Sequence, residues 1–142
     1  TEVDALAIAI GTSHGAYKFK GEVKLDFERL EEIARRVDIP LVLHGASGVP
    51  KLVLERAERF GAKLPGAKGI PDEAIQRAIS LGICKINIDT DLRLSFVSAL
   101  REVLVTKPEE FDPRKLLGPG RDAIKQTVQS KMRLFGSSGK SI

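Results

Sequence analysis

Three apolar runs along the chain end in glycine or polar residues, a pattern typical of strands buried in a parallel sheet. The runs cover residues 5–10, 41–43 and 83–88, and the first two are followed by Gly11 and His44. In βα units, the polar residues that follow the strands gather at one edge of the sheet, where active sites form. The pattern therefore predicts an α/β fold with its chemistry at the strand ends.

Apolar residues at helical spacing fill the intervals between these runs. One helix is predicted over residues 27–37, with Asp26 as its N-cap. A second helix starts at Pro50, because proline suits the first turn, and a third runs from Pro71 to a stop at Gly82. This alternation of strands and helices predicts parallel βα units.

The last third of the chain is predicted to be helical. Asp91 is expected to cap a helix, and a final helix is expected from about Pro119 to Phe135. The residues expected on the core side of the first of these helices are Leu92, Phe96, Leu100, Val103 and Leu104. The chain thus has room for about three βα units and a helical tail. At 142 residues it is too short to close a (β/α)₈ barrel, which typically needs about 250 residues, and we expect it to be cut from a longer chain.

The amino-acid composition argues against some classes of binding partner. Charged residues make up 30% of the chain and are mixed in sign, the net charge is +4, and there is one tyrosine and no tryptophan. We therefore expect no nucleic-acid binding, and no apolar stretch reaches the ~18 residues of a membrane span. Cys84, the single cysteine, lies in an apolar run and is predicted to be buried; a chain without an internal disulfide fits the cytoplasm.

The only two histidines, His14 and His44, each precede a glycine near the end of an apolar run. Neutral imidazoles suit zinc, and a catalytic zinc usually has three protein ligands and one open position. The pair therefore indicates a metal site whose third ligand comes from elsewhere. The alternative is that each histidine is a structural hydrogen-bonding residue.

Two short turns, residues 45–48 and 89–91, precede helices and combine backbone amides with a hydroxyl side chain. Such turns can cradle an anion, although helix capping alone also explains them. Lys18, Arg93 and Arg114 could supply charge to phosphates or lie on the surface as solvated side chains. In the third run, Lys85, Asn87 and Asp89 share one face, which would line the interior of a barrel, and Cys84, Ile86 and Ile88 share the other.

Four motifs in one order resemble class II fructose-1,6-bisphosphate aldolase. They are Gly-Thr-Ser-His-Gly-Ala-Tyr-Lys (11–18), His-Gly-Ala-Ser-Gly-Val-Pro (44–50), Lys-Ile-Asn-Ile-Asp-Thr-Asp-Leu-Arg (85–93) and Phe-Asp-Pro-Arg-Lys (111–115). The resemblance covers essentially the whole chain and corresponds to the C-terminal half of that enzyme. It implies that residues 1–142 are the C-terminal part of a single TIM-barrel domain.

The resemblance implies a zinc enzyme that reversibly cleaves fructose 1,6-bisphosphate to dihydroxyacetone phosphate and glyceraldehyde 3-phosphate. His14 and His44 would be two of the three zinc ligands, and zinc would stabilise the enediolate as a Lewis acid. Asn87 would hydrogen-bond the reacting end of the ketose. The residues implied around the dihydroxyacetone-phosphate end are Gly15, Lys18, Gly45, Ser47, Asp89 and Thr90.

Further roles follow from the same resemblance. Carbonyls around Gly15 and Gly45 would bind a monovalent cation, Na⁺ or K⁺. Arg93 would face the aldehyde-side phosphate, and Arg114 would reach the site of a neighbouring subunit in a homodimer or homotetramer. The family's third zinc histidine and its proton-transferring aspartate belong to the N-terminal half, so no general base is assigned here. Gly120 stands where the family pattern predicts alanine.

Two other functions fit the sequence. Tagatose 1,6-bisphosphate aldolase belongs to the same family and differs in the configuration that it accepts at one carbon. A non-catalytic half-barrel that binds phosphate, or its missing half, is the other alternative, because the chain offers two zinc histidines and no matching base. An open sheet edge would favour such an association.

Overall fold

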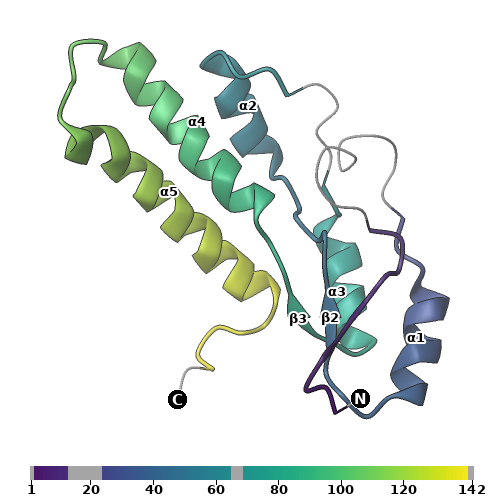
Figure 1. Cartoon of the computed structure of the whole chain (residues 1–142). Coiled ribbons are helices and arrows are strands. Elements are labelled where there is room, and N and C mark those ends of the chain that lie inside the picture. Colours follow the sequence, from purple (N-terminus) through teal and green to yellow (C-terminus); the bar gives the residue numbers. More distant parts are fainter. Residues whose placement is uncertain (1, 13–23, 65–68, 141–142) are drawn as a thin grey trace. The chain divides into compact units, whose positions relative to one another are not determined.

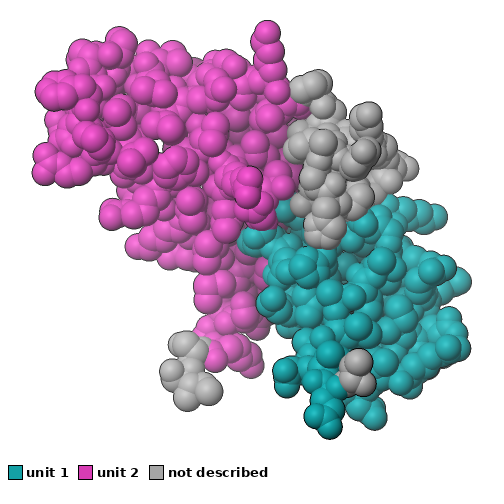
Figure 2. Space-filling view, in the orientation of Figure 1, with its two compact units in different colours: residues 1–48, 68–88 teal, residues 49–67, 89–142 magenta. Residues whose placement is uncertain are grey.

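The computed structural model describes residues 2–12, 24–64 and 69–140. Its contacts divide the chain into two compact units, which Figure 2 shows in different colours. Unit 1 consists of residues 1–48 and 68–88, and unit 2 of residues 49–67 and 89–142. Each unit is built around its own set of packed elements.

Unit 1 contains a parallel three-stranded sheet with the order β1-β2-β3 (Figure 1). The strands are β1 (Leu6–Ile8), β2 (Leu41–Leu43) and β3 (Ile83–Ile86). All three predicted apolar runs therefore form strands, although β1 and β3 are shorter than the runs. The side chains of β2 are all buried, as expected for a central strand covered on both faces.

The pairing of β2 with β3 contains an irregularity. Leu41 pairs with Ile83, whereas Val42 pairs with Lys85, so Cys84 has no partner in the register. An extra residue of this kind is a β-bulge, which disturbs the alternation of faces. Cys84 is exposed, and the prediction that it is buried is wrong, because the bulge places it outside the regular ladder.

The helices of unit 1 follow the predicted signals. Helix α1 spans Phe27–Arg36, and the Asp26 carboxylate caps it by accepting a hydrogen bond from Arg29 N at 2.9 Å. That backbone hydrogen bond lowers the pKa of Asp26. Helix α3 spans Asp72–Ser80 and is followed by Gly82, whose φ of 113° allows the chain to turn into β3.

Unit 2 is helical. It consists of α2 (Lys51–Arg59), α4 (Thr90–Thr106) and α5 (Pro113–Leu134), with α4 packed against both α2 and α5 (Figure 1). The buried face of α4 differs from the prediction. Its buried residues are Asp91, Ser95, Ser98, Ala99 and Val103. Of the five predicted core residues only Val103 is buried, and Leu104 is 51% exposed.

Small side chains explain this face, because they let neighbouring helices approach closely. Ser95 and Ser98 satisfy their hydroxyls within the unit: Ser95 Oγ donates to Asp91 O at 2.7 Å, and Ser98 Oγ donates to Ser95 O at 3.0 Å. Helix α5 also starts earlier than predicted. Asp112 caps it through Arg114 N at 2.9 Å, Pro113 occupies its first turn, and Pro119 lies inside the helix.

Among the described residues, no helix is long and apolar enough to cross a membrane.

Two glycines on α5 offer a matched test of this packing. A Cβ at Gly120 would come within 2.6 Å of the Phe96 ring, whereas a Cβ at Gly118 would meet nothing within 4 Å. Phe96 therefore occupies the space of the alanine expected from the family pattern. We predict that Gly120→Ala lowers the free energy of unfolding by about 1–3 kcal/mol through overpacking. Gly118→Ala should raise it by about 0.5–1 kcal/mol through helix propensity.

Urea unfolding of the complete protein measures both changes. Equal effects of the two substitutions would contradict the close contact between Gly120 and Phe96.

Candidate functional site

The ends of β2 and β3 bring His44 and Asn87 together. His44 follows β2 directly, and Asn87 N donates to Leu43 O at 3.0 Å, which fixes the chain after β3 beside the end of β2. Asn87 Nδ2 lies 3.2 Å from Nδ1 and 3.0 Å from Nε2 of His44. These nearly equal distances mean that the amide does not select one ring nitrogen. The predicted histidine and asparagine thus form a polar pair at the carboxyl edge of the sheet.

The turn after His44 contains two more predicted residues. Gly45 has a φ of 65°, a conformation in which glycine carries no Cβ penalty. Ser47 is fully buried, and its Oγ has no hydrogen-bond partner among the described residues. Buried hydroxyls are normally paired, because an unpaired one loses its hydrogen bonds to water without replacement. This hydroxyl therefore has hydrogen-bonding capacity for a ligand.

A second segment of unit 1 supports the same turn. Ile70 N donates to Ser47 O at 3.1 Å. A Cβ on Gly69 would lie 2.0 Å from the carbonyl carbon of Gly48, so only glycine fits at position 69. The backbone at residues 69–70 thus packs directly on the turn that holds Ser47. Sequence reasoning missed this support, although the Gly-rich composition of residues 61–69 was a usable signal.

In unit 2, the start of α4 carries three predicted residues. Asp89 occupies the N-cap position without making a side-chain capping hydrogen bond, and Thr90 is the first residue of the helix. Arg93 Nε donates to Asp89 Oδ1 at 2.9 Å, and both side chains are exposed. Arg93 therefore pairs with a carboxylate one turn earlier. Asp91 is not the cap that was predicted: it is buried in the first turn and accepts a hydrogen bond from Val49 N at 2.7 Å.

Arg114, at the start of α5, is 90% exposed along its side chain and pairs with Asp112. Its Nη2 lies 2.8 Å from Asp112 Oδ2. The side-chain hydrogen bonds from Arg114 lower the pKa of Asp112, and the same bonds raise the pKa of Arg114. The guanidinium is thus fully charged and accessible to an anion.

Three predicted residues, His14, Gly15 and Lys18, lie outside the described residues. The residues on either side of the segment that contains them are in contact. Asp26 N donates to Ile10 O at 2.9 Å, and Gly11, with a φ of 99°, lies against the Lys24 carbonyl, where a Cβ would be 2.4 Å from the oxygen. The two flanks of the segment therefore meet beside the start of α1.

The described ranges contain no group of three or more His, Cys, Asp or Glu residues that could hold a metal ion. His44 is the single predicted metal ligand within them. Its imidazole has the donor chemistry that Zn²⁺ prefers.

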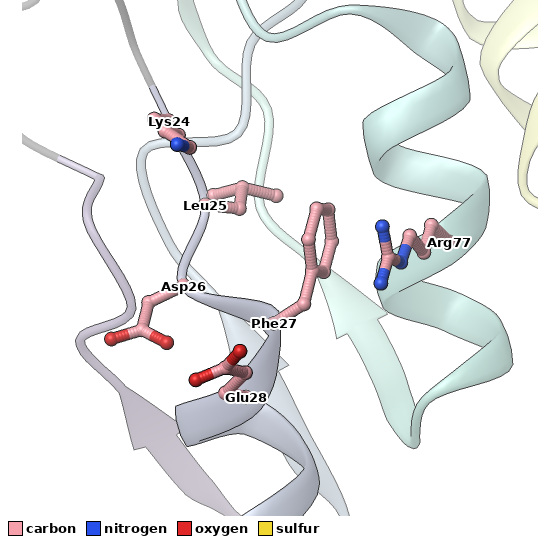
Figure 3. A pocket seen from close by; sticks show the side chains of 6 residues that line it. All are labelled: Lys24, Leu25, Asp26, Phe27, Glu28 and Arg77. Carbon is pink, nitrogen blue, oxygen red and sulfur yellow. The ribbon is translucent and has the colours of Figure 1, made fainter.

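A surface pocket of about 460 Å³ adjoins α1 in unit 1 (Figure 3). Arg77 lies over the Phe27 ring, 4.3 Å from its centroid, in a cation–π contact. The other lining residues are Lys24, Leu25, Asp26 and Glu28. None of the predicted site residues lines this pocket, so we do not assign the candidate site to it.

Comparison with known proteins decides the family. A family model described as fructose-bisphosphate aldolase class-II matches residues 1–64 and 63–140. The chain belongs to the class II fructose-bisphosphate aldolase family. A fructose-bisphosphate aldolase of Thermus caldophilus is 57% identical over 141 residues, which are 99% of this chain and 46% of that protein. One of Giardia intestinalis is 52% identical over 141 residues, 98% of this chain and 44% of the relative.

Solved aldolase structures share the fold. The YdjI aldolase from Escherichia coli K12 matches with a TM-score of 0.67 and 34% identity, over 98% of this chain and 41% of that one. A fructose-bisphosphate aldolase from Campylobacter jejuni matches with a TM-score of 0.68 over 95% of this chain and 40% of that one; at 23% identity it shows the fold alone. These matches confirm the predicted fold class, that of a TIM barrel. The chain spans less than half the length of the relatives that it matches.

Alanine substitutions of Ser47 and Ser95 test whether the Ser47 hydroxyl contributes to the stability of the protein. Both are buried, but Ser95 Oγ donates to Asp91 O and lies 2.7 Å from Thr127 Oγ1, whereas Ser47 Oγ has no described partner. We predict that Ser95→Ala lowers the free energy of unfolding by about 1–2 kcal/mol. Ser47→Ala should change it by less than about 0.5 kcal/mol, because no hydrogen bond is lost.

Chemical denaturation of the two variants without ligand measures the difference. A loss at Ser47→Ala as large as that at Ser95→Ala would show that the Ser47 hydroxyl serves stability.

Proposed function

We propose that the complete protein cleaves fructose 1,6-bisphosphate reversibly to dihydroxyacetone phosphate and glyceraldehyde 3-phosphate. The observation that carries this proposal is the His44–Asn87 pair at adjoining strand ends, in a chain of the class II aldolase family. The turn that begins at this pair also buries the Ser47 hydroxyl without a described partner. A polar pair and an available hydroxyl suit a substrate that has a carbonyl and a phosphate group.

The residues of unit 1 have distinct roles in this proposal. The Asn87 side chain, held at the end of β2 by its backbone hydrogen bond to Leu43, hydrogen-bonds the reacting end of the ketose. Ser47 donates its hydroxyl to a phosphate oxygen, and backbone amides of the turn that starts at Gly45 bind the same group. Gly15 and Lys18 act at the same phosphate, and carbonyls around Gly15 and Gly45 bind a monovalent cation.

The residues of unit 2 supply the remaining phosphate contacts. Asp89 and Thr90 lie at the N-terminus of α4, where backbone amides are unpaired within the helix. Arg93 and Arg114 are exposed and bind phosphate by exchanging their aspartate partners for it. Surface ion pairs of this kind are weak, so a phosphate dianion can replace the carboxylate.

We further propose that His14 and His44 are two ligands of a divalent metal, Zn²⁺ being the ion expected for imidazole donors. The third ligand and the general base would come from the half of the relatives that this chain does not span. When bound, the metal supplies a Lewis acid for the substrate carbonyl. His44 contributes its imidazole ring beside the Asn87 amide at the strand end.

A coupled assay of the complete protein tests this function. We expect cleavage of fructose 1,6-bisphosphate that a chelator abolishes and Zn²⁺ restores. Ser47→Ala should raise KM about tenfold through the loss of one hydrogen bond to phosphate. Ser130→Ala, at an exposed position of α5, should change neither KM nor kcat.

The outcomes separate the alternatives. Faster cleavage of tagatose 1,6-bisphosphate would assign the substrate to the sister enzyme. No cleavage of either sugar by the complete, metal-loaded protein would overturn the proposal and favour a non-catalytic phosphate-binding barrel. Light scattering of the same sample tests the predicted homodimer or homotetramer.

A further inference from the structure

The turn of residues 45–48 is held at two points by backbone hydrogen bonds within unit 1. Asn87 N donates to Leu43 O at 3.0 Å just before the turn begins, and Ile70 N donates to Ser47 O at 3.1 Å. The second hydrogen bond fixes the peptide group on the C-terminal side of Ser47. The backbone of Ile70 therefore contacts the turn at the residue whose buried hydroxyl has no described partner.

Gly69 allows this contact because it has no side chain. An added Cβ at position 69 would overlap the carbonyl group of Gly48, which is backbone and cannot rotate away as the end of a flexible side chain could. The φ of Gly69 lies outside the left-handed region, so its backbone conformation does not itself require glycine. The requirement at this position is for space alone. An alanine there therefore tests the close approach without adding backbone strain.

The segment that starts at Gly69 is fixed on its other side by the core of unit 1. Ile70 is 2% exposed. The next residue, Pro71, is the N-cap of α3 and accepts backbone hydrogen bonds from Ala74 N and Ile75 N. Ile75 is buried, and α3 contacts β3. A side chain at position 69 cannot be accommodated by a free shift of this segment, so the displacement falls on the turn.

We propose that Gly69 and Ile70 are positioning residues for the turn that carries Ser47. Gly69 lets its backbone lie against Gly48, and the Ile70 amide holds the Ser47 carbonyl. Together they keep the turn in one conformation before a ligand arrives, so less conformational freedom is lost when a phosphate oxygen binds the Ser47 hydroxyl. The effect on substrate rests on the proposed function, whereas the effect on the turn rests on contacts within unit 1.

Amide hydrogen exchange of the complete protein tests the effect on the turn without any activity. In the wild type the Ile70 amide should be protected, because it donates to Ser47 O. Gly69→Ala should raise exchange at Ile70 about tenfold or more through the loss of this hydrogen bond, while α1 keeps its protection. Unprotected exchange at Ile70 in the wild type, or unchanged exchange in Gly69→Ala, would overturn the proposal.

Gly82→Ala is the matched control within unit 1. Gly82 has a φ of 113°, and an added Cβ would lie 3.3 Å from Ala34 Cβ and within 4 Å of no atom of the turn. This alanine adds backbone strain without touching the turn, so it should change exchange at Ile70 and in α1 by similar factors. Similar factors at Ile70 and in α1 in Gly69→Ala would show that Gly69 serves stability alone, and would overturn the positioning role.

A second pair of variants tests the hydrogen bond if Gly69→Ala does not fold. Ile70→Pro removes the N–H that donates to Ser47 O and leaves Gly69 in place. Ile70→Val shortens the same buried side chain but keeps the N–H, so it controls for the loss of packing.

The kinetic readout separates positioning from stability. Gly69→Ala and Ile70→Pro should each raise the KM for fructose 1,6-bisphosphate about tenfold with a smaller change in kcat, because the turn that binds phosphate is less ordered. Gly82→Ala and Ile70→Val should leave KM unchanged. An unchanged KM in both Gly69→Ala and Ile70→Pro would overturn the effect on substrate. If the wild type shows no cleavage, the proposed function fails, and the exchange experiment still decides whether the turn is held.

Discussion

The parallel pairing of β2 with β3 is the constraint on which the candidate site depends. Parallel strands end at the same edge of a sheet, so the residues that follow β2 and β3 become neighbours without any further device. The bulge at Cys84 changes the register by one residue, and the hydrogen bond from Asn87 N to Leu43 O continues the pairing beyond β3. His44 and Asn87 meet because of this register. A register without the bulge would place a different residue of the third run opposite the end of β2.

In unit 2, four of the five buried residues of α4 have small or polar side chains. Ser95 and Ser98 donate hydrogen bonds within α4, and Gly120 accepts the Phe96 ring in the space that a Cβ would fill. Such packing brings helix backbones close together, but it leaves buried polar groups that each need a partner. The Ser47 hydroxyl in unit 1 is different, because no described group satisfies it. This contrast is the reason that the proposed function assigns the Ser47 hydroxyl to substrate binding.

Much of the fold could be predicted from local signals. The three apolar runs, the Asp26 cap and the Gly82 stop act through neighbouring residues, and the structure agrees with them. The errors arose where distant contacts decide. The burial of Cys84 depended on a register shift with β2, and the start of α5 depended on Asp112 and Pro113 overriding Pro119 as a helix boundary. Of the candidate site, the sequence pattern placed His44 and Asn87 at the ends of two apolar runs, and only the family resemblance gave Asn87 a role. The buried ion pair of Lys131 gave no local signal, since its partner lies 40 positions earlier in the chain.

The described basic side chains that pair with aspartates differ in their exposure to solvent. This difference supports different roles for exposed and for buried ion pairs. Arg93 and Arg114 are exposed side chains that pair with aspartates; solvent screens the attraction there, and an incoming anion can compete. Lys131 pairs with Asp91 away from solvent, where exchanging partners would leave a buried charge uncompensated. Mobile, exposed guanidinium groups suit a ligand that binds and leaves, and a buried ammonium suits a permanent contact. In the proposed function, the same type of interaction recruits substrate at the surface, whereas in the interior it holds the backbone amide of Val49.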